Sequence, residues 1–194
     1  MKKIKYLIVT AIIIIMGLSF AQNAHAAEKY PYTKITGTDG HFVDEKMGMS
    51  FVLLESDHFP GRYWTRRPSD GWLYLAKLAK DPMAAGQVFY FDRDVQVMTP
   101  GDPYGTHWER GKWHLVCSYQ DTFTWLTVKE NGFYFDTLQW TNAKSGYQNP
   151  STQLWRLRLV KDKGGYQVIR LSSMSKNGAA AAGWGEARPR KYPM

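Results

Sequence analysis

The tetrapeptide Phe-Tyr-Phe-Asp occurs twice in this chain, at 89–92 and 133–136, and the related His-Phe-Val-Asp occupies 41–44. The starts of these three segments lie 48 and 44 residues apart. A tryptophan follows each aspartate after 19–21 residues; these are Trp64, Trp113 and Trp155. A unit repeated at a fixed period buries its apolar face by stacking on its copies, so this order predicts three units of about 45 residues.

Short aromatic and β-branched runs alternate with turn signals through the rest of the chain, as in the runs 123–128 and 166–173 and the turn 99–105. Many short strands joined by regular turns favour an all-β fold. One unit of this size supplies about four strands and cannot bury its apolar face alone, whereas three units together can close the sheet around a common core. We expect the three tryptophans, and the phenylalanines of both Phe-Tyr-Phe-Asp segments, to lie in that core.

Residues 1–26 have the organisation of a secretory signal peptide. A basic start is followed by the apolar run 7–20 and by the small-residue sequence Ala-His-Ala, which ends at Ala26. The apolar run is too short for a stable membrane span, and the small residues suit a cleavage site. We therefore expect cleavage near Ala26 and a secreted protein, periplasmic or extracellular.

One domain fits the remaining length, and we place it at 27–178. Residues 179–194 are expected to form a closing strand and a basic C-terminal tail with Arg188, Arg190 and Lys191. The formal charge of +8 falls to +5 after cleavage, because the signal segment carries three lysines and no acid. A basic excess of this size suits an anionic surface such as phospholipid, lipopolysaccharide or acidic polysaccharide, and equally serves solubility.

Several functional classes lack their residues here. Cys117 is the only cysteine, so an intramolecular disulfide is impossible and a buried, inert thiol is expected. His107 and His114 match no metal-ligand spacing, and the chain has no glycine-rich phosphate loop and no nucleophile elbow. No basic run interleaves with aromatics as in nucleic-acid binders. We expect no metal, no cofactor, no nucleic-acid partner and no enzymatic activity.

Three such units in an exported all-β chain resemble a β-trefoil. Within that fold, residues 133–157 resemble a ricin-type lectin repeat, in which a strand ending in an apolar residue and Asp is followed by an aromatic, an asparagine and a Gln-x-Trp. The Gln-x-Trp lies at 153–155, and the matching positions of the other units, 62–64 and 111–113, hold Arg-Tyr-Trp and Gly-Lys-Trp. The resemblance implies a carbohydrate-binding module.

Two further resemblances concern single segments. Residues 50–78 are similar to a repeat of the arabinose-binding trefoil modules, with a Phe-Pro-Gly-x-Tyr turn, although the Tyr-Trp-Thr-Arg-Arg that follows lacks their histidine. Residues 111–132 resemble one stretch of a laminin-G sandwich, which would also imply binding to a sugar or a receptor. This second likeness does not account for the threefold spacing.

The lectin resemblance implies a sugar site in the third unit. A sugar needs a flat apolar platform for one face of its ring and fixed polar groups for its hydroxyls. Asp136 and Asn142 would bond the hydroxyls, Trp140 would be the platform, and Tyr147 and Gln153 complete the set. Equivalent sites would be marked by Asp44 and Asp92. Alternatively, each aspartate caps a turn by accepting backbone N–H bonds, and Gln153 bonds a turn.

These residues favour an exported, lectin-like protein that recognises a cell-surface glycan or polysaccharide, alone or as a toxin or adhesion subunit. The alternative is a β-trefoil without a sugar site, which binds a protein such as a partner toxin subunit, or an anionic membrane surface. In that case the basic tail and exposed aromatic side chains would make the contact.

Overall fold

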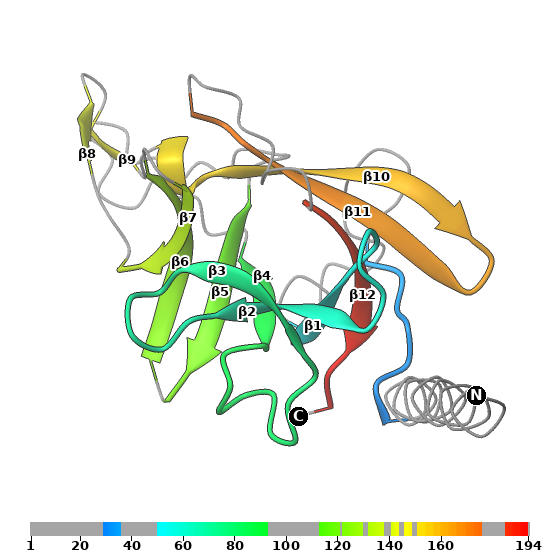
Figure 1. The fold of residues 1–194 in the computed structure, drawn as a ribbon. Helices are drawn as coiled ribbons and strands as arrows, with labels where there is room; N and C mark the ends of the chain where they lie inside the picture. The colour runs from blue at the N-terminus through cyan, green and yellow to red at the C-terminus, as the bar shows by residue number, and fades with distance from the viewer. Residues whose placement is uncertain are drawn as a thin grey trace, which may run out of the picture. The chain divides into compact units, whose positions relative to one another are not determined.

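A computed structural model describes residues 29–35, 50–92, 113–120, 122–129, 132–137, 141–143, 146–148, 151–175 and 185–193. Its contacts divide the chain into two units, Met1–Pro31 and Tyr32–Met194. Only residues 29–31 of the first unit are described, so the fold is that of the second unit (Figure 1). Within the described ranges, no helix has the length and hydropathy needed to cross a membrane.

The second unit is all-β, as the sequence predicts, and its only described helix is the 3-10 turn η2 (Ser151–Gln153). Short strands follow one another along the chain because aromatic and β-branched runs are interrupted by Gly, Pro, Asp and Asn. The strands are β1 (Val52–Ser56), β2 (Arg62–Arg66), β3 (Leu73–Lys77), β4 (Phe89–Asp92), β5 (His114–Tyr119), β6 (Thr122–Lys129), β7 (Gly132–Asp136), β8 (Thr141–Ala143), β9 (Gly146–Gln148), β10 (Trp155–Lys163), β11 (Tyr166–Ser173) and β12 (Glu186–Lys191).

Ten of these strands form one sheet, and β8 and β9 form a separate pair. The order in the large sheet is β10-β11-β12-β1-β4-β5-β6-β7, with the β2–β3 hairpin joined to β1. Trp113, directly before β5, exchanges two backbone hydrogen bonds of 2.9 Å with Trp155 of β10. The strands β1, β4, β5, β10, β11 and β12 therefore close into a ring, and the hairpins β2–β3 and β6–β7 extend from it (Figure 1).

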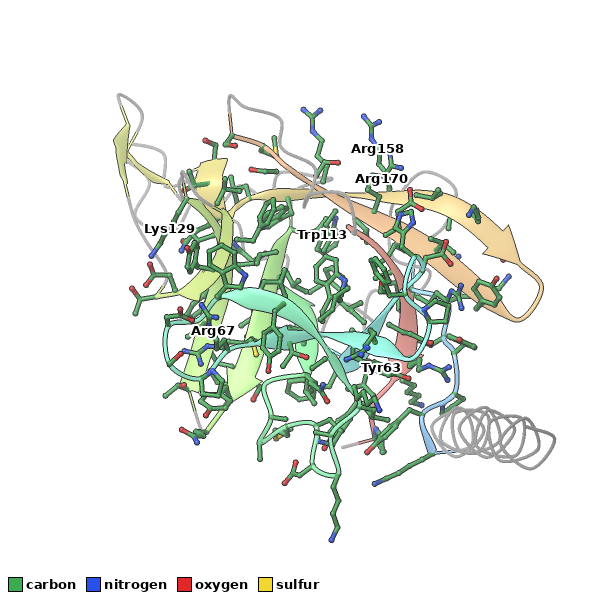
Figure 2. All side chains as sticks on the ribbon, viewed as in Figure 1. Tyr63, Arg67, Trp113, Lys129, Arg158 and Arg170 are labelled. Carbon is green, nitrogen blue, oxygen red and sulfur yellow. The ribbon has the colours of Figure 1, made fainter. Side chains whose placement is uncertain are left out.

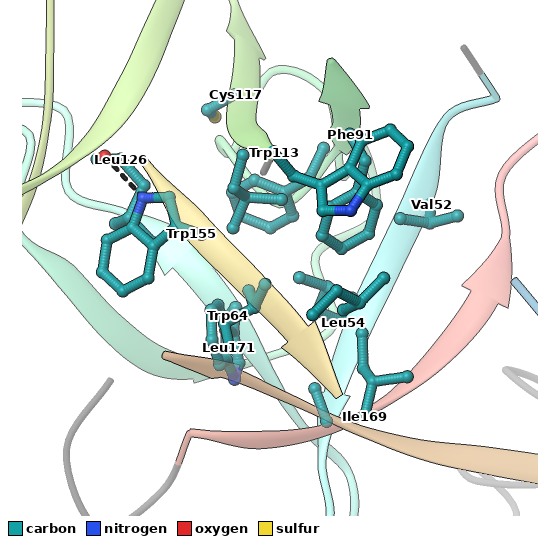
Figure 3. Close-up of a cluster of buried hydrophobic side chains, with 14 of the residues drawn as sticks. Val52, Leu54, Trp64, Phe91, Trp113, Cys117, Leu126, Trp155, Ile169 and Leu171 are labelled. Atoms are coloured by element: carbon teal, nitrogen blue, oxygen red, sulfur yellow. Dashed lines mark hydrogen bonds between the residues drawn. The ribbon is translucent and has the colours of Figure 1, made fainter. Parts of the chain in front are cut away.

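The interior of this sheet is a single cluster of apolar side chains contributed by every strand of the ring. Trp64 and Trp155 have no exposed surface and Trp113 is 7% exposed, which confirms the predicted core position of all three (Figure 3). Cys117 is buried in the same cluster, and burial raises the pKa of its thiol to about 12. A thiol with this pKa stays protonated and inert at neutral pH, as expected.

The structure contains an internal repeat, but the residues that correspond to each other in it are not those predicted from the sequence. Gln87 donates from Nε2 to Thr65 Oγ1 (3.0 Å) and to the carbonyl of Lys77 (2.8 Å). Gln153 donates from Nε2 to Thr127 Oγ1 (2.9 Å) and to the carbonyl of Thr137 (2.8 Å). The matching residues lie 60 to 66 positions apart. The partner of Gln-Leu-Trp at 153–155 is thus Gln-Val-Phe at 87–89.

The two hairpins match residue for residue around these glutamines. In the first hairpin Tyr63 is opposite Ala76 and Thr65 is opposite Tyr74. In the second, Trp125 is opposite Asp136 and Thr127 is opposite Tyr134. Each threonine hydroxyl also donates to the carbonyl two residues earlier, at 2.9 Å in both hairpins. The β2–β3 and β6–β7 hairpins are therefore equivalent copies, each fixed by one buried glutamine.

The two Phe-Tyr-Phe-Asp segments are not equivalent. The copy at 89–92 is β4, which lies in the ring between β1 and β5. The copy at 133–136 lies in β7, which pairs with β6 in the hairpin and forms a single bridge, through Tyr134, with Trp72 directly before β3. The two segments share a sequence because both belong to strands whose side chains alternate between the core and the outside. Their 44-residue spacing does not relate equivalent strands.

The C-terminal basic residues belong to a strand and not to a tail. Five residues of β12 are paired with β1. The Arg190 side chain is 5% exposed and donates from Nε to Glu55 at 2.8 Å, while Arg188 donates from Nε to Asp57 at 2.6 Å. These two arginines are therefore committed to carboxylates of the same sheet, and only Lys191 of the predicted basic set is exposed.

Candidate functional site

The outward face of the β6–β7 hairpin gathers aromatic rings around one carboxylate. Tyr134 and Asp136 are two residues apart on β7 and so share a face, and Trp125 lies directly opposite Asp136 on β6. The inward neighbours, Leu126 and Phe133, fill the core. Trp125, Tyr134 and Asp136 are each partly exposed, so solvent reaches this face.

Asp136 is held by two donors. Its Oδ2 forms an ion pair with Lys129 Nζ at 2.8 Å. Its Oδ1 accepts a hydrogen bond from the backbone N–H of Thr137 at 2.8 Å. The Lys129 interaction is the main reason why the pKa of Asp136 lies below its ordinary value, and the Thr137 N–H lowers it further against the opposing effect of burial. The side chain is 32% exposed, so the ionised carboxylate can still accept bonds from outside.

Trp72 extends the aromatic surface from the neighbouring hairpin. Its ring meets that of Tyr134 edge-on, with centroids 4.8 Å apart and an interplanar angle of 82°. Lys129 Nζ, which is paired with Asp136, also lies 5.1 Å from the centroid of the Tyr134 ring. Trp72, Tyr134, Lys129 and Asp136 thus form one chain of contacts, and together with Trp125 we call them the Asp136 face.

The turn between β2 and β3 positions Trp72. Arg67 binds Asp70 through two hydrogen bonds, from Nε at 2.8 Å and from Nη2 at 2.5 Å. Asp70 Oδ1 also accepts the backbone N–H of Trp72 at 3.0 Å, and the guanidinium lies 5.7 Å from the centroid of the Trp72 ring. The bonds from Arg67 and from the Trp72 N–H lower the pKa of Asp70 to about 2, so this clamp persists in acid.

Gly132 provides the space that Trp72 occupies. A Cβ at Gly132 would lie 3.1 Å from Cη2 of Trp72, and the φ of +151° is one that residues with side chains rarely adopt. We expect Gly132→Ala to lower the free energy of unfolding by about 1–3 kcal/mol and to shift the tryptophan fluorescence as Trp72 moves. Urea unfolding followed by fluorescence measures both.

Gly164→Ala is the matched control, because no atom lies within 4 Å of the added methyl and φ is not positive there. It should change the stability by less than about 0.5 kcal/mol. Equal stability of the two variants would show that Trp72 does not pack on Gly132 as described.

The comparison of the two hairpins shows what is particular to the Asp136 face. Tyr74 occupies the position of Tyr134, but the position of Asp136 holds Ala76 and that of Trp125 holds Tyr63. Tyr63 is 2% exposed, so it offers no surface to a ligand. At these matching strand positions, only β6–β7 places a carboxylate beside accessible aromatic residues.

The structure brings together two of the five residues predicted for the sugar site. Gln153 donates to the carbonyl of Thr137, whose N–H is bound by Asp136, but Gln153 itself is fully buried. It positions the strand end next to Asp136 and has no surface for a ligand. Asn142 and Tyr147 are backbone partners in the β8–β9 pair, and their side chains are outside the described part of the chain, as is Trp140.

Of the two predicted repeat-equivalent aspartates, the one that the structure describes, Asp92, does not form a matching site. Asp44 lies outside the described residues. Asp92 ends β4 opposite His114, in the ring and not in a hairpin. The alternative role predicted for these aspartates is seen at Asp136, whose carboxylate accepts the N–H of the next residue.

Four residues of the Asp136 face were missed from the sequence, namely Trp72, Trp125, Lys129 and Tyr134. Tyr134 could have been found, because a residue two positions before Asp136 on a strand lies on the same face. Trp125 and Lys129 require the register of the β6–β7 hairpin, for which Asn-Gly at 131–132 is the sequence signal. Trp72 comes from a distant turn, and no local pattern predicts it.

Comparisons with known proteins give little guidance. No protein-family model matches the chain, and no curated protein matches it. The crystal structure of a mutant of HCR/D is similar over 73% of this chain, with 10% sequence identity and a TM-score of 0.41. The aligned part spans 36% of that longer chain.

Proposed function

We propose that this chain is an exported glycan-binding protein and that the Asp136 face is its sugar site. The observation that carries the proposal is the grouping of Trp125, Tyr134 and Trp72 with an ionised, partly exposed carboxylate. An aromatic ring offers an apolar surface to the C–H face of a pyranose, and a carboxylate accepts two hydroxyl bonds. Lys129 adds a donor for a third hydroxyl.

The charges of this face favour an uncharged sugar. Lys129 is paired with Asp136, and Arg67 is paired with Asp70. Each cation thus has its own carboxylate, and a negatively charged ligand would have to compete with both. A neutral hexose or pentose can bond both members of an ion pair without breaking it, because its hydroxyls donate and accept.

We also propose that the fold is a β-trefoil. The support is the closed ring with the equivalent hairpins β2–β3 and β6–β7, each pinned by a Gln-x-aromatic segment. Export after cleavage near Ala26 belongs to the same proposal, as does action on a cell-surface glycan, alone or as a toxin or adhesion subunit.

Asp136→Ala tests the sugar site. The variant loses the hydrogen bonds that the Asp136 carboxylate would accept from the sugar. We therefore expect it to bind the glycan at least roughly tenfold more weakly. The variant should fold, because the equivalent position of the first hairpin is already Ala76. A glycan array with neutral, acidic and arabinose-containing sugars identifies the ligand, and calorimetry then measures both Kd values.

Asp162→Ala is the matched control, since Asp162 is also exposed and ion-paired with a lysine, Lys34, at 2.7 Å. It removes an equal negative charge at a position outside the β6–β7 hairpin, so Kd for the glycan should stay unchanged. No signal from the native protein on the array would contradict glycan binding and favour the alternative of a protein or membrane partner. Equal loss in both variants would contradict the placement of the site.

A further inference from the structure

A second surface of the molecule gathers three arginines, of which two have no carboxylate partner among the described residues. On the outward face of the β10–β11 hairpin, Arg158 lies directly opposite Arg170, and Arg156 lies two residues from Arg158 on the same face. All three side chains are exposed, whereas their chain neighbours Leu157 and Leu171 are buried in the core. Figure 2 shows Arg158 and Arg170 on the outer side of these strands. We call these three residues the arginine face.

Other basic side chains of this region, including Arg170 of the arginine face itself, are paired with carboxylates. Arg170 is ion-paired with Glu186, Arg188 with Asp57, and Lys161 also with Asp57. His58 lies 4.0 Å from the remaining oxygen of Glu186. Among the described residues, the acids of this region are therefore already occupied.

Arg156 and Arg158 differ from these neighbours. No carboxylate of the described residues lies within ion-pair distance of either guanidinium. Arg170, which is paired with Glu186, adds a third guanidinium directly across from Arg158. Like charges placed directly opposite on a sheet repel each other. This repulsion is relieved when an anion binds to the arginines.

We propose that the arginine face binds an acidic polysaccharide through its carboxylate or sulfate groups. A guanidinium forms paired, parallel hydrogen bonds with such planar or tetrahedral anions. Arginines two residues apart on a strand are separated by roughly 7 Å, so they can contact successive charged groups of an extended polymer. This binding is additional to the neutral-sugar site at Asp136 and uses different strands.

The flanking side chains favour a polysaccharide over a lipid surface. Proteins that dock on membranes combine basic residues with exposed aromatic or large apolar side chains that enter the interface. In the described part of the chain, the exposed large apolar residues are Phe59, Tyr74, Phe123 and Val160. Only Val160 lies on β10 or β11, and valine is a weak interfacial anchor.

The experiment measures binding of the full chain to heparin, to polygalacturonate, and to vesicles of phosphatidylglycerol and phosphatidylcholine. The double variant Arg156→Gln/Arg158→Gln should bind heparin or polygalacturonate at least roughly tenfold more weakly, because two charge-assisted contacts are lost. Arg62→Gln is the matched control, as it removes an exposed arginine from β2, and it should bind like the native chain. The thermal midpoint of the double variant should not fall, since its side chains are exposed.

Each outcome decides the proposal. Selective loss in the double variant supports it, and a partial loss in Arg158→Lys would show that the guanidinium matters beyond its charge. Equal binding of native chain and double variant overturns it, as does binding to the anionic vesicles but to neither polysaccharide. Asp136→Ala should retain heparin or polygalacturonate binding, so a failure of the neutral-sugar site and a failure of the arginine face are distinguishable.

Discussion

Trp155→Ala is expected to lower the free energy of unfolding by about 3–5 kcal/mol, as is typical of removing a buried tryptophan side chain. Trp155 has no exposed surface. Its ring packs against that of Phe133, with the two ring centroids 5.9 Å apart. Its indole Nε1 donates to the carbonyl of Leu126 at 2.9 Å, which ties β10 to the β6–β7 hairpin (Figure 3). The alanine variant loses the packing, leaves a cavity and leaves that carbonyl without its donor.

Urea unfolding measures the loss, with circular dichroism as the signal because a tryptophan has been removed. Trp155→Phe should cost less, since it keeps most of the packing and loses only the N–H bond. Phe123→Ala is the control for deleting an aromatic ring, because Phe123 is 50% exposed, and its effect should stay within about 0.5 kcal/mol. A Trp155→Ala variant as stable as Phe123→Ala would contradict the placement of Trp155 at the closure of the ring.

The same residue shows what the sequence could reveal about the fold. Trp64, Trp113 and Trp155 were predictable as core residues, because large apolar side chains in short alternating strands are normally buried. The register of the repeat was not predictable from Phe-Tyr-Phe-Asp, since any strand with an apolar inward face can carry that pattern. The structural repeat depends on Gln87 and Gln153, which are separated by 66 residues because the connections differ in length.

The residues of the Asp136 face were harder to predict for a related reason. Asp136 stood out because it ends a strand, but its neighbours Trp125 and Lys129 are set by hairpin register and Trp72 by a turn of another hairpin. The C-terminal segment contains the predicted strand, β12, but its basic residues lie in that strand and not in a tail. The carboxylate partner of Arg190 lies 135 residues away, and no local pattern shows that a charged residue will be buried.

The buried ion pair between β1 and β12 is the second feature on which the fold depends strongly. Glu55 is 3% exposed, and its carboxylate is fully engaged. Oε2 accepts from Arg190 Nε and from the hydroxyl of Tyr32, both at 2.8 Å, and Oε1 accepts the backbone N–H of Gly61 at 2.8 Å. Arg190 also lies over the Tyr32 ring, 3.7 Å from its centroid. This network joins the segment before β1, the β1–β2 turn and the last strand.

Glu55→Ala is expected to lower the free energy of unfolding by about 3–5 kcal/mol, because it leaves the Arg190 charge buried without that carboxylate. The double variant Glu55→Leu/Arg190→Leu should recover part of this loss, since no charge then stays buried without its partner, although Tyr32 and Gly61 still lack their acceptor. Urea unfolding of the native chain, Glu55→Leu, Arg190→Leu and the double variant closes a thermodynamic cycle. A coupling free energy near zero between Glu55 and Arg190 would contradict the pairing. A large coupling free energy would show that this ion pair holds the last strand, β12, against β1.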